Sequence, residues 1–189
     1  MDNYGDWITL KEEVKRCKGC ELSSSQRVLD KGNRDARIMI VGDKPTVNVK
    51  GEAEVLSKDA LTYVEETLAL FDIDPKSVYI TNLVNCAAPL YQRIKKTDLE
   101  ACIKCLRKQF SLVKPEIVLC LGTLAAKTLI DKNFNLAENH GNPINKGKVM
   151  FMATFHPNSF GYDTDNRDAF LSDITELYKF CKTYPPYSK

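Results

Sequence analysis

The sequence predicts an α/β protein, a three-layer α/β/α sandwich around a central, mainly parallel four-stranded sheet. Two observations carry this prediction: four short apolar runs rich in β-branched residues, and segments of helical periodicity between them. Strands that alternate with helices imply right-handed crossovers, which place helices on both faces of the sheet. The chain has 189 residues, 43% of them apolar. This length suits one core, so we expect a single domain over residues 1–189.

Each expected strand is a short apolar run that ends near a turn signal or a polar residue. The four strands cover residues 36–43, 77–86, 115–122 and 148–155, with the sequences ARIMIVGD, SVYITNLVNC, PEIVLCLG and KVMFMATF. Continuous apolar runs of this kind are typical of strands that are buried on both faces of a parallel sheet. We therefore expect them to form the middle layer.

The helices are expected where apolar residues recur every three or four positions. They cover residues 7–17, 57–71, 97–113, 123–130 and 166–182. In the second of these, Ser57 or Asp59 is expected to cap the N-terminus, and the following DIDP stops the helix.

Composition limits the classes of function. The net charge of +2 permits a nucleic-acid partner without requiring one. No apolar run approaches the roughly 20 residues that cross a bilayer, and the first residues lack the pattern of a signal peptide. We expect a cytoplasmic protein without membrane contact, acting as a monomer. In a reducing compartment the seven cysteines are expected to be metal ligands or buried thiols rather than disulfides.

Three polar residues lie at the carboxyl ends of predicted strands, where sites in open α/β sheets are found. They are Asp43, Asn82 and His156. The chain has only two histidines, and Pro157 follows His156 directly, which fixes the loop that holds the imidazole. The alternative is a strand-end histidine with a purely structural hydrogen bond.

Five cysteines have the spacing of metal ligands. Cys17 and Cys20 form a CxxC pair, Cys102 and Cys105 form a second, and Cys86 follows a strand. Four thiolates could build a tetrahedral zinc site or hold a [4Fe-4S] cluster, and spacing alone does not choose between them. For the second pair, packing in the core is the alternative.

These motifs follow one another in an order that is similar to the uracil-DNA glycosylase superfamily, in particular to its iron-sulfur branch, family 4. A CxxC stands near the start, a cysteine follows the strand reading YITN, another stands some fifteen residues further on, and HPN stands where the family has HPS. PEIVLCLG and HGNP lie between them, and the resemblance covers residues 17 to about 162. It implies a uracil-DNA glycosylase-like fold.

The resemblance also implies a metal centre of structural role in an N-terminal metal-binding segment, and it favours a [4Fe-4S] cluster over zinc. The family's ligands map to Cys17, Cys20, Cys86 and Cys102, with Cys105 as the alternative fourth ligand.

The first motif departs from the family. GDKPTVNVKGEAEVL stands where the family has GEAPG, an acidic loop and GxPF. Asp43 replaces the glutamate, the loop to Gly51 is two residues shorter, and Glu54 falls where the family has the phenylalanine that stacks on uracil. A carboxylate supplies no stacking face. The basic, proline-rich segment after the third cysteine is also altered, to AAPLYQRIKK.

The resemblance implies roles for the polar residues. Asp43 is expected to stabilise charge on the sugar and to orient or deprotonate water, and His156 to donate to the departing base. Asn82 is expected to read the flipped base, while Lys44 and Glu54 bond polar substituents.

We therefore expect a monofunctional DNA glycosylase that acts on a modified pyrimidine, for example hydroxymethylcytosine or its glucosylated form in phage DNA, with an antiviral role. Excision of ordinary uracil in base excision repair is the main alternative. A non-catalytic iron-sulfur module that binds DNA is the alternative of another class.

Two segments are expected to contact DNA. Arg93, Lys95 and Lys96 form a basic cluster suited to phosphates, although a solvated helix start has the same pattern. Asn158, Ser159 and Phe160 lie after His156, and Phe160 or Tyr162 could wedge into the duplex. The alternative for Phe160 is packing within the loop.

Overall fold

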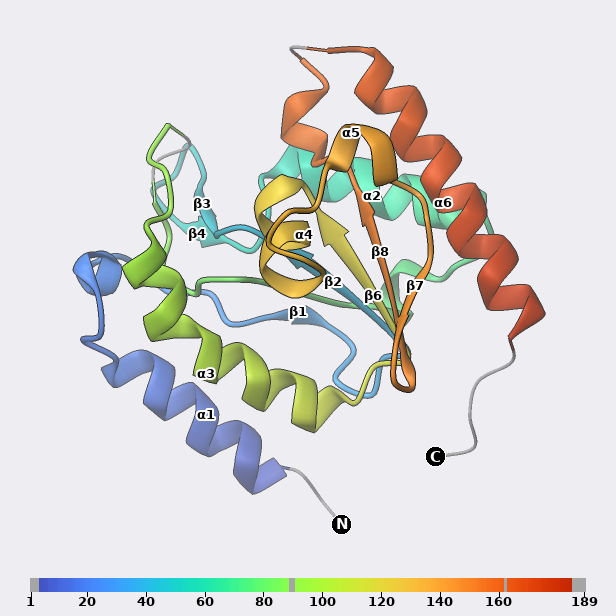
Figure 1. Ribbon diagram of the computed structural model, residues 1–189. Coiled ribbons are helices and arrows are strands. Elements are labelled where there is room, and N and C mark those ends of the chain that lie inside the picture. The colour runs from blue at the N-terminus through green and yellow to red at the C-terminus, as the bar shows by residue number, and fades with distance from the viewer. Residues whose placement is uncertain (1–3, 89–90, 162, 185–189) are drawn as a thin grey trace.

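The computed structural model describes residues 4–88, 91–161 and 163–184. Its main sheet has six strands in the order β1-β5-β2-β6-β8-β7 (Figure 1). The central four are parallel and match the prediction: β5 (Tyr79–Asn82), β2 (Ile38–Gly42), β6 (Ile117–Leu121) and β8 (Val149–Thr154).

Two antiparallel edge strands correct the expected number of four. β1 (Lys31–Gly32) pairs with β5, and β7 (Ile144–Lys146) pairs with β8. Both are short and largely exposed, so neither carries the apolar pattern of a buried strand. The sheet is therefore a parallel core with a short antiparallel strand on each side.

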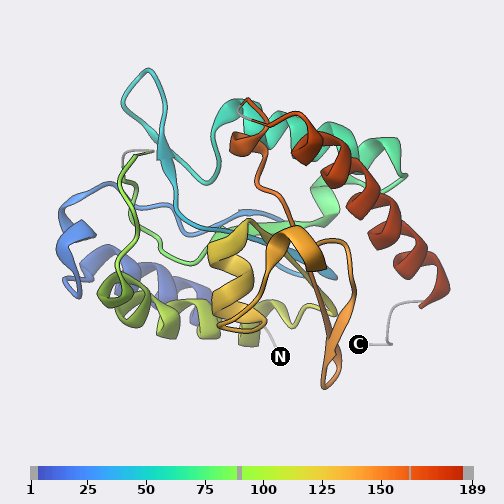
Figure 2. The ribbon, with the colours of Figure 1, turned by 45° about the horizontal axis from the view of Figure 1, so that its top comes forward.

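The core strands are buried because helices cover both faces (Figure 2). The longer helices are α1 (Tyr4–Arg16) and α3 (Lys96–Val113) on one face, and α2 (Lys58–Leu70) and α6 (Asp165–Thr183) on the other. Trp7 and Leu106 pack with Val41 on the first face, whereas Val64 and Phe170 pack in a separate cluster on the second. This confirms the three layers. None of the described helices is long and apolar enough to span a membrane.

Shorter elements connect the strands and the longer helices. They are η1 (Glu21–Ser24), η2 (Pro75–Ser77), α4 (Thr123–Leu129), α5 (Leu136–Asn139) and η3 (Pro157–Ser159). Helix α2 begins as expected, since the Ser57 hydroxyl accepts the Ala60 N–H at 3.4 Å.

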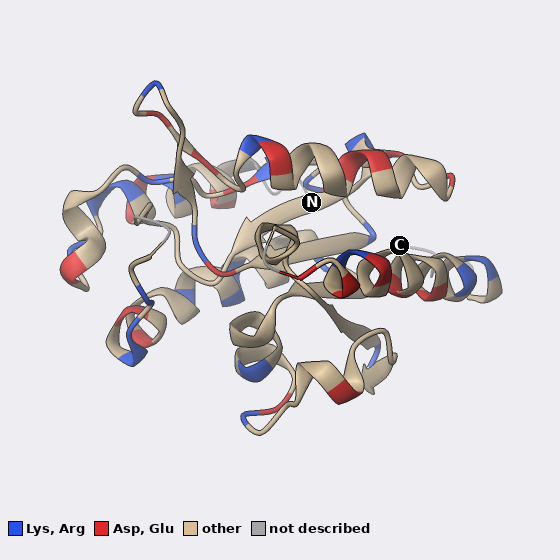
Figure 3. Cartoon of the chain, turned by 90° about the horizontal axis from the view of Figure 1, so that it is seen from above, with Lys and Arg blue, Asp and Glu red and all other residues tan. Residues whose placement is uncertain are grey.

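The altered first motif forms a β-hairpin of β3 (Thr46–Val47) and β4 (Ala53–Glu54), which is a sheet of its own. Figures 2 and 3 show it standing out from the rest of the chain. No strand was expected here, because a strand of two residues leaves no periodic pattern in the sequence.

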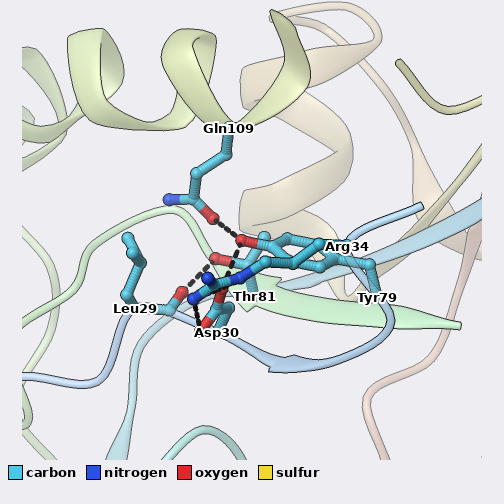
Figure 4. A network of polar contacts seen from close by, with 6 residues as sticks. All are labelled: Leu29, Asp30, Arg34, Tyr79, Thr81 and Gln109. Atoms are coloured by element: carbon cyan, nitrogen blue, oxygen red, sulfur yellow. Dashed lines mark hydrogen bonds and ion pairs between the residues drawn. The ribbon is translucent and has the colours of Figure 1, made fainter. Parts of the chain in front are cut away.

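A buried polar network fixes the amino end of β5 to its neighbours (Figure 4). The Tyr79 hydroxyl donates to Gln109 Oε1 at 2.8 Å and lies 3.3 Å from Asp30 Oδ2. Arg34 Nε donates to the same carboxylate at 2.9 Å, and Thr81 Oγ1 donates to the Leu29 carbonyl at 2.8 Å. The segment before β1 is thereby tied to both the sheet and α3.

Candidate active site

The parallel strands bring their carboxyl ends to one edge of the sheet. Strand order places Asn82 of β5 beside the end of β2, which leads into Asp43. The end of β6 follows at Gly122, and the end of β8 leads into His156. The three predicted polar residues therefore lie along the same edge, as expected.

A cavity of about 530 Å³ lies at this edge and is lined by both Asp43 and His156. The structure thus brings the two predicted catalytic residues to one open space. Further residues of the lining come from α4, α5 and their connection, and include Thr123, Lys127, Asn133, Phe134, Asn135 and Leu136, while Phe155 and Ser159 flank the histidine. The cavity has aromatic walls as well as polar groups.

Asp43 is a largely buried carboxylic acid. Burial raises its pKa from 3.8 to about 6, opposed by the backbone N–H of Ala125 and by the charge of Lys44. Oδ1 is buried and has no hydrogen-bond partner among the described residues. Asp43 is therefore an ionised carboxylate at neutral pH, with one oxygen left to accept a proton or a hydrogen bond.

His156 is held as a neutral imidazole with a defined tautomer. Nδ1 accepts the backbone N–H of Asn158 at 3.1 Å, so in the neutral ring the proton lies on Nε2. Burial lowers the pKa of His156 to about 4. At neutral pH the side chain is an uncharged N–H donor at the wall of the cavity.

Gly122 allows β6 to end close to His156. Its φ is +88°, and a Cβ at this position would lie 3.4 Å from the Cβ of His156. The Gly122 N–H also donates to the Thr154 carbonyl at 2.7 Å. Any other residue would strain the backbone at this φ, so position 122, directly after β6, requires glycine.

Asn82 lies at the edge but does not line this cavity. Its side-chain Nδ2 donates to the Val55 carbonyl at 2.7 Å. Oδ1 is buried without a partner among the described residues, and a Cβ on Gly42 would approach it to 2.6 Å. In this arrangement Asn82 keeps Oδ1 as an acceptor and the second N–H of its amide as a donor, the pair expected from sequence.

Lys44 and Glu54, expected to bond substituents of the base, point elsewhere. The Lys44 ammonium donates to the Gln92 carbonyl, and burial lowers the pKa of Lys44. Glu54 Oε1 accepts a hydrogen bond from Asn48 Nδ2 at 2.8 Å, within the β3–β4 hairpin. Neither residue lines the cavity that Asp43 and His156 share. The geometry therefore does not support the substituent-binding role of either residue.

The expected phosphate-binding residues are partly neutralised by neighbouring carboxylates. Lys95 pairs with Glu21 at 2.5 Å, and Lys96 lies 3.6 Å from Glu100. Arg93 is exposed and forms no ion pair with a carboxylate of the described segments. Of the three, Arg93 best fits the expected role in phosphate binding.

The residues after His156 divide between the cavity and the core. Ser159 lines the cavity, and its hydroxyl donates to the His156 carbonyl at 2.8 Å. Asn158 is exposed and accepts from Ser57 Oγ at 2.9 Å. Phe160 packs edge-on against Tyr63, with ring centroids 4.9 Å apart, which favours the packing alternative. Tyr162, the other candidate wedge, lies outside the described residues.

The candidate metal ligands gather where η1, α3 and the segment after β5 meet. Cys20, Cys86 and Cys102 belong to one small buried cluster. Cys17 and Cys105 line an adjacent cavity of about 460 Å³. Within the described ranges, no three or more histidine, cysteine or acidic side chains stand in a metal-binding arrangement.

The chemistry of these thiols nevertheless fits a soft metal centre. Burial raises the pKa of Cys102 to about 11, and the neighbouring thiols of Cys86, Cys105 and Cys20 add to this. The backbone N–H of Asn85 favours the Cys102 thiolate, as hydrogen bonds do in iron-sulfur sites. Burial also raises the pKa of Cys86, whereas the Arg27 guanidinium lowers it. A group that binds thiolates would remove the cost of burying them as charges.

Sequence reasoning missed the α4–α5 wall of the cavity. Asn133, Phe134 and Asn135 belong to no recognised motif, and the third strand ends in a glycine rather than in a polar residue. The available signal was positional: β6 lies between β2 and β8, so the segment that follows it must border the same edge.

Comparison with known proteins agrees with this architecture. The family described as the uracil DNA glycosylase superfamily matches residues 29–178. A type-4 uracil-DNA glycosylase of Thermotoga maritima is 29% identical over 179 residues, covering 92% of this chain and 93% of the relative. That of Archaeoglobus fulgidus is 28% identical, covering 98% and 97%. A type-5 enzyme of Pyrobaculum aerophilum is 29% identical over 70% of this chain and 58% of its own length. The chain therefore belongs to the uracil-DNA glycosylase superfamily.

Proposed function

We propose that this DNA glycosylase hydrolyses the N-glycosidic bond of a flipped pyrimidine, with Asp43 and His156 as the catalytic pair. The observation that carries the proposal is the shared cavity, with a carboxylate on one side and a neutral N–H donor on the other. A base must leave the stack to reach such a site.

In the proposed reaction the bond between C1′ of the sugar and the ring nitrogen breaks, and its electron pair leaves with the base. His156 donates from Nε2–H to the base oxygen on which negative charge grows. Asp43 stabilises the positive charge of the sugar, orients a water molecule towards C1′ and accepts a proton from it. The products are the free base and an abasic site.

The substrate we propose is a modified pyrimidine, such as hydroxymethylcytosine or its glucosylated form in phage DNA. Glu54 stands where the resemblance places the stacking phenylalanine, so the usual aromatic wall is missing. The cavity of about 530 Å³ is large enough for a substituted base and has Phe134 and Phe155 among its walls. An enzyme of this kind would act against phage, as a monomer on DNA in the cytoplasm.

Uracil excision in base excision repair is the second candidate. It is favoured by the type-4 uracil-DNA glycosylases that the chain resembles over more than nine-tenths of its length. An acceptor on Asn82 also suits the N3–H of uracil.

The deciding experiment is abasic-site formation on matched oligonucleotides that carry uracil, hydroxymethylcytosine or glucosylated hydroxymethylcytosine. Asp43→Ala accompanies each substrate as the control. Cleavage of a modified cytosine supports the proposal, and cleavage of uracil alone supports repair. Binding of DNA without cleavage of any strand supports a non-catalytic module and contradicts the proposal.

For the metal centre we propose a structural [4Fe-4S] cluster held by Cys17, Cys20, Cys86 and Cys102. When bound, the cluster would cross-link η1, α3 and the segment after β5. The protein should then be brown, with a broad band near about 400 nm. Cys102→Ser should remove the band, whereas Cys105→Ser, the matched control, should keep it. The reverse result would make Cys105 the fourth ligand, and a colourless protein with one zinc ion would exclude the cluster.

A further inference from the structure

The β3–β4 hairpin rises directly from the catalytic edge. β3 begins at Thr46, shortly after Asp43, and β4 leads back to Val55, whose carbonyl accepts from Asn82. Figures 1 and 2 show the hairpin beside the segment that precedes α3, and the Lys44 contact with the Gln92 carbonyl joins the two. The hairpin therefore rises from the edge that carries Asp43 and Asn82, and it is fixed at its base.

The tip of the hairpin is held in one conformation. Asn48 Oδ1 accepts the backbone N–H groups of Lys50 and Glu52 at 2.9 and 3.0 Å. Gln26 braces the tip from outside, since its Nε2 donates to the Gly51 carbonyl and its Oε1 accepts the Ala53 N–H, both at 2.8 Å. Such bonds order the turn before it meets any partner.

Val49 is presented at this ordered tip with its side chain fully in solvent. Its relative exposure is 104%, against 52% for Val47 on the same hairpin. Single exposed apolar residues are ordinary on protein surfaces. Here, however, an apolar side chain is displayed on a braced projection beside the site of a DNA glycosylase, and the exposed Lys50 follows it.

We propose that Val49 is a wedge that enters the base stack of duplex DNA next to the flipped nucleotide, while Lys50 contacts a phosphate. Apolar wedges of this kind hold open the gap that unstacking creates. Phe160 is a poorer candidate because its ring is packed between Tyr63 and Phe170. Val49 is thus a positioning residue, which acts on base extrusion and not on the glycosidic bond.

The proposal predicts an effect that depends on strandedness. A single strand needs no wedge, because its base is not held in a duplex. Val49→Ala should lower kcat/KM on a duplex about tenfold or more and leave kcat/KM on the same sequence as a single strand unchanged. Gln26→Ala, which loosens the tip, should act in the same direction, and Val47→Ala is the matched control that should not. Equal losses on both substrates, or none on the duplex, would overturn the proposal.

A binding test remains informative whichever base is excised. Wild-type protein should prefer a duplex that contains a tetrahydrofuran abasic analogue over the intact duplex, because Val49 fills the gap. Val49→Ala should lose this preference, keep its affinity for intact duplex and retain the wild-type Tm. A preference that survives the substitution would overturn the wedge. If the enzyme cleaves no modified cytosine, the preference for the abasic analogue should still be present in wild type. A wrong substrate and a wrong role for Val49 can therefore be told apart.

Discussion

The two ends of strand β5 carry buried polar residues, but the hydrogen bonds of these residues are satisfied to different degrees. At the amino end, the Tyr79 hydroxyl donates to the Gln109 amide oxygen at 2.8 Å and lies 3.3 Å from the Asp30 carboxylate (Figure 4). Within the described residues, Gln109 Nε2 is the member of this network that lacks a partner. At the carboxyl end, the Oδ1 atoms of Asn82 and of the adjacent Asp43 both lack one.

This difference separates structural from functional burial of polar groups. A buried polar group contributes to stability only if its hydrogen bonds are made, and Tyr79 meets that condition. Asp43 does not, and its raised pKa shows that the folded state holds its charge at a cost. The buried polar residues at the amino end stabilise the fold, whereas those at the carboxyl end lower its stability and leave polar atoms available for reaction.

Asp43→Asn should have the largest effect, at the carboxyl end. The amide keeps the shape of the side chain but cannot accept a proton from water, so base release should slow about 10²–10⁴-fold. Single-turnover formation of abasic sites measures this loss. A gel-shift assay with the same oligonucleotide should show unchanged DNA binding, and a variant of wild-type activity would remove Asp43 from the mechanism.

The same variant should be more stable than wild type at pH 7. The folded state, with a pKa of about 6 against 3.8, binds the proton of Asp43 more tightly than the unfolded state does. The stability contribution is therefore present below about pH 4 and is lost as the pH rises to about 6, at most about 3 kcal/mol. Thermal unfolding at pH 4 and pH 7 tests this, and a Tm below that of wild type at pH 7 would contradict it.

His156→Gln should slow base release about 10²–10³-fold, because a donor to the departing base is lost or displaced. Single-turnover formation of abasic sites measures this loss.

In wild type the rate of base release should rise with pH through about 6, as Asp43 ionises, and then stay level. No limb from His156 is expected between pH 5 and 8, since its pKa is lowered to about 4. A falling limb near neutrality that disappears in the variant would show instead that the protonated imidazole is the active form.

The core of the fold could be predicted because burial leaves a pattern in the sequence. β2 and β6 are continuous apolar runs, and both are fully buried in the sheet. β1 and the β3–β4 hairpin left no such pattern, because two residues are too few to show one and contacts with distant parts of the chain hold them in place. Gln26, which braces the hairpin through Gly51 and Ala53, is an example.

The site could be predicted only where a residue's place follows from the end of a strand. Asp43 and His156 were found in this way, and they share one cavity. Side-chain direction does not follow from strand position, so the bonds of Lys44 to Gln92 and of Glu54 to Asn48 were not foreseen. Phe134 was missed for the related reason that an irregular connection carries it to the cavity.

Tyr79→Phe tests the amino end and should have the opposite profile to Asp43→Asn. Removal of the hydroxyl leaves the buried oxygen of Gln109 without its donor, which should lower the free energy of unfolding by about 1–3 kcal/mol. Base release should be unchanged, because the network lies at the far end of β5 from Asp43. Urea unfolding and the abasic-site assay measure the two quantities. A loss of activity without a loss of stability would contradict the assignment of stability to the amino end of β5 and of catalysis to its carboxyl end.

Glu54→Phe should have the smallest effect, and it tests how the hairpin beside the carboxyl end influences the choice of base. The resemblance places a stacking aromatic at this position, and an aromatic contact is worth about 0.5–1.5 kcal/mol beyond its burial. A phenyl ring cannot make the bond that holds Glu54 to Asn48, so it is free to turn toward the cavity, and uracil excision should rise about two- to tenfold. Glu54→Leu is the matched control, since it removes the same charge and the same bond without supplying a π face. An equal gain in both variants would mean that the carboxylate repels the substrate, whereas a gain in the phenylalanine variant alone would mean that the missing aromatic wall sets the choice of base.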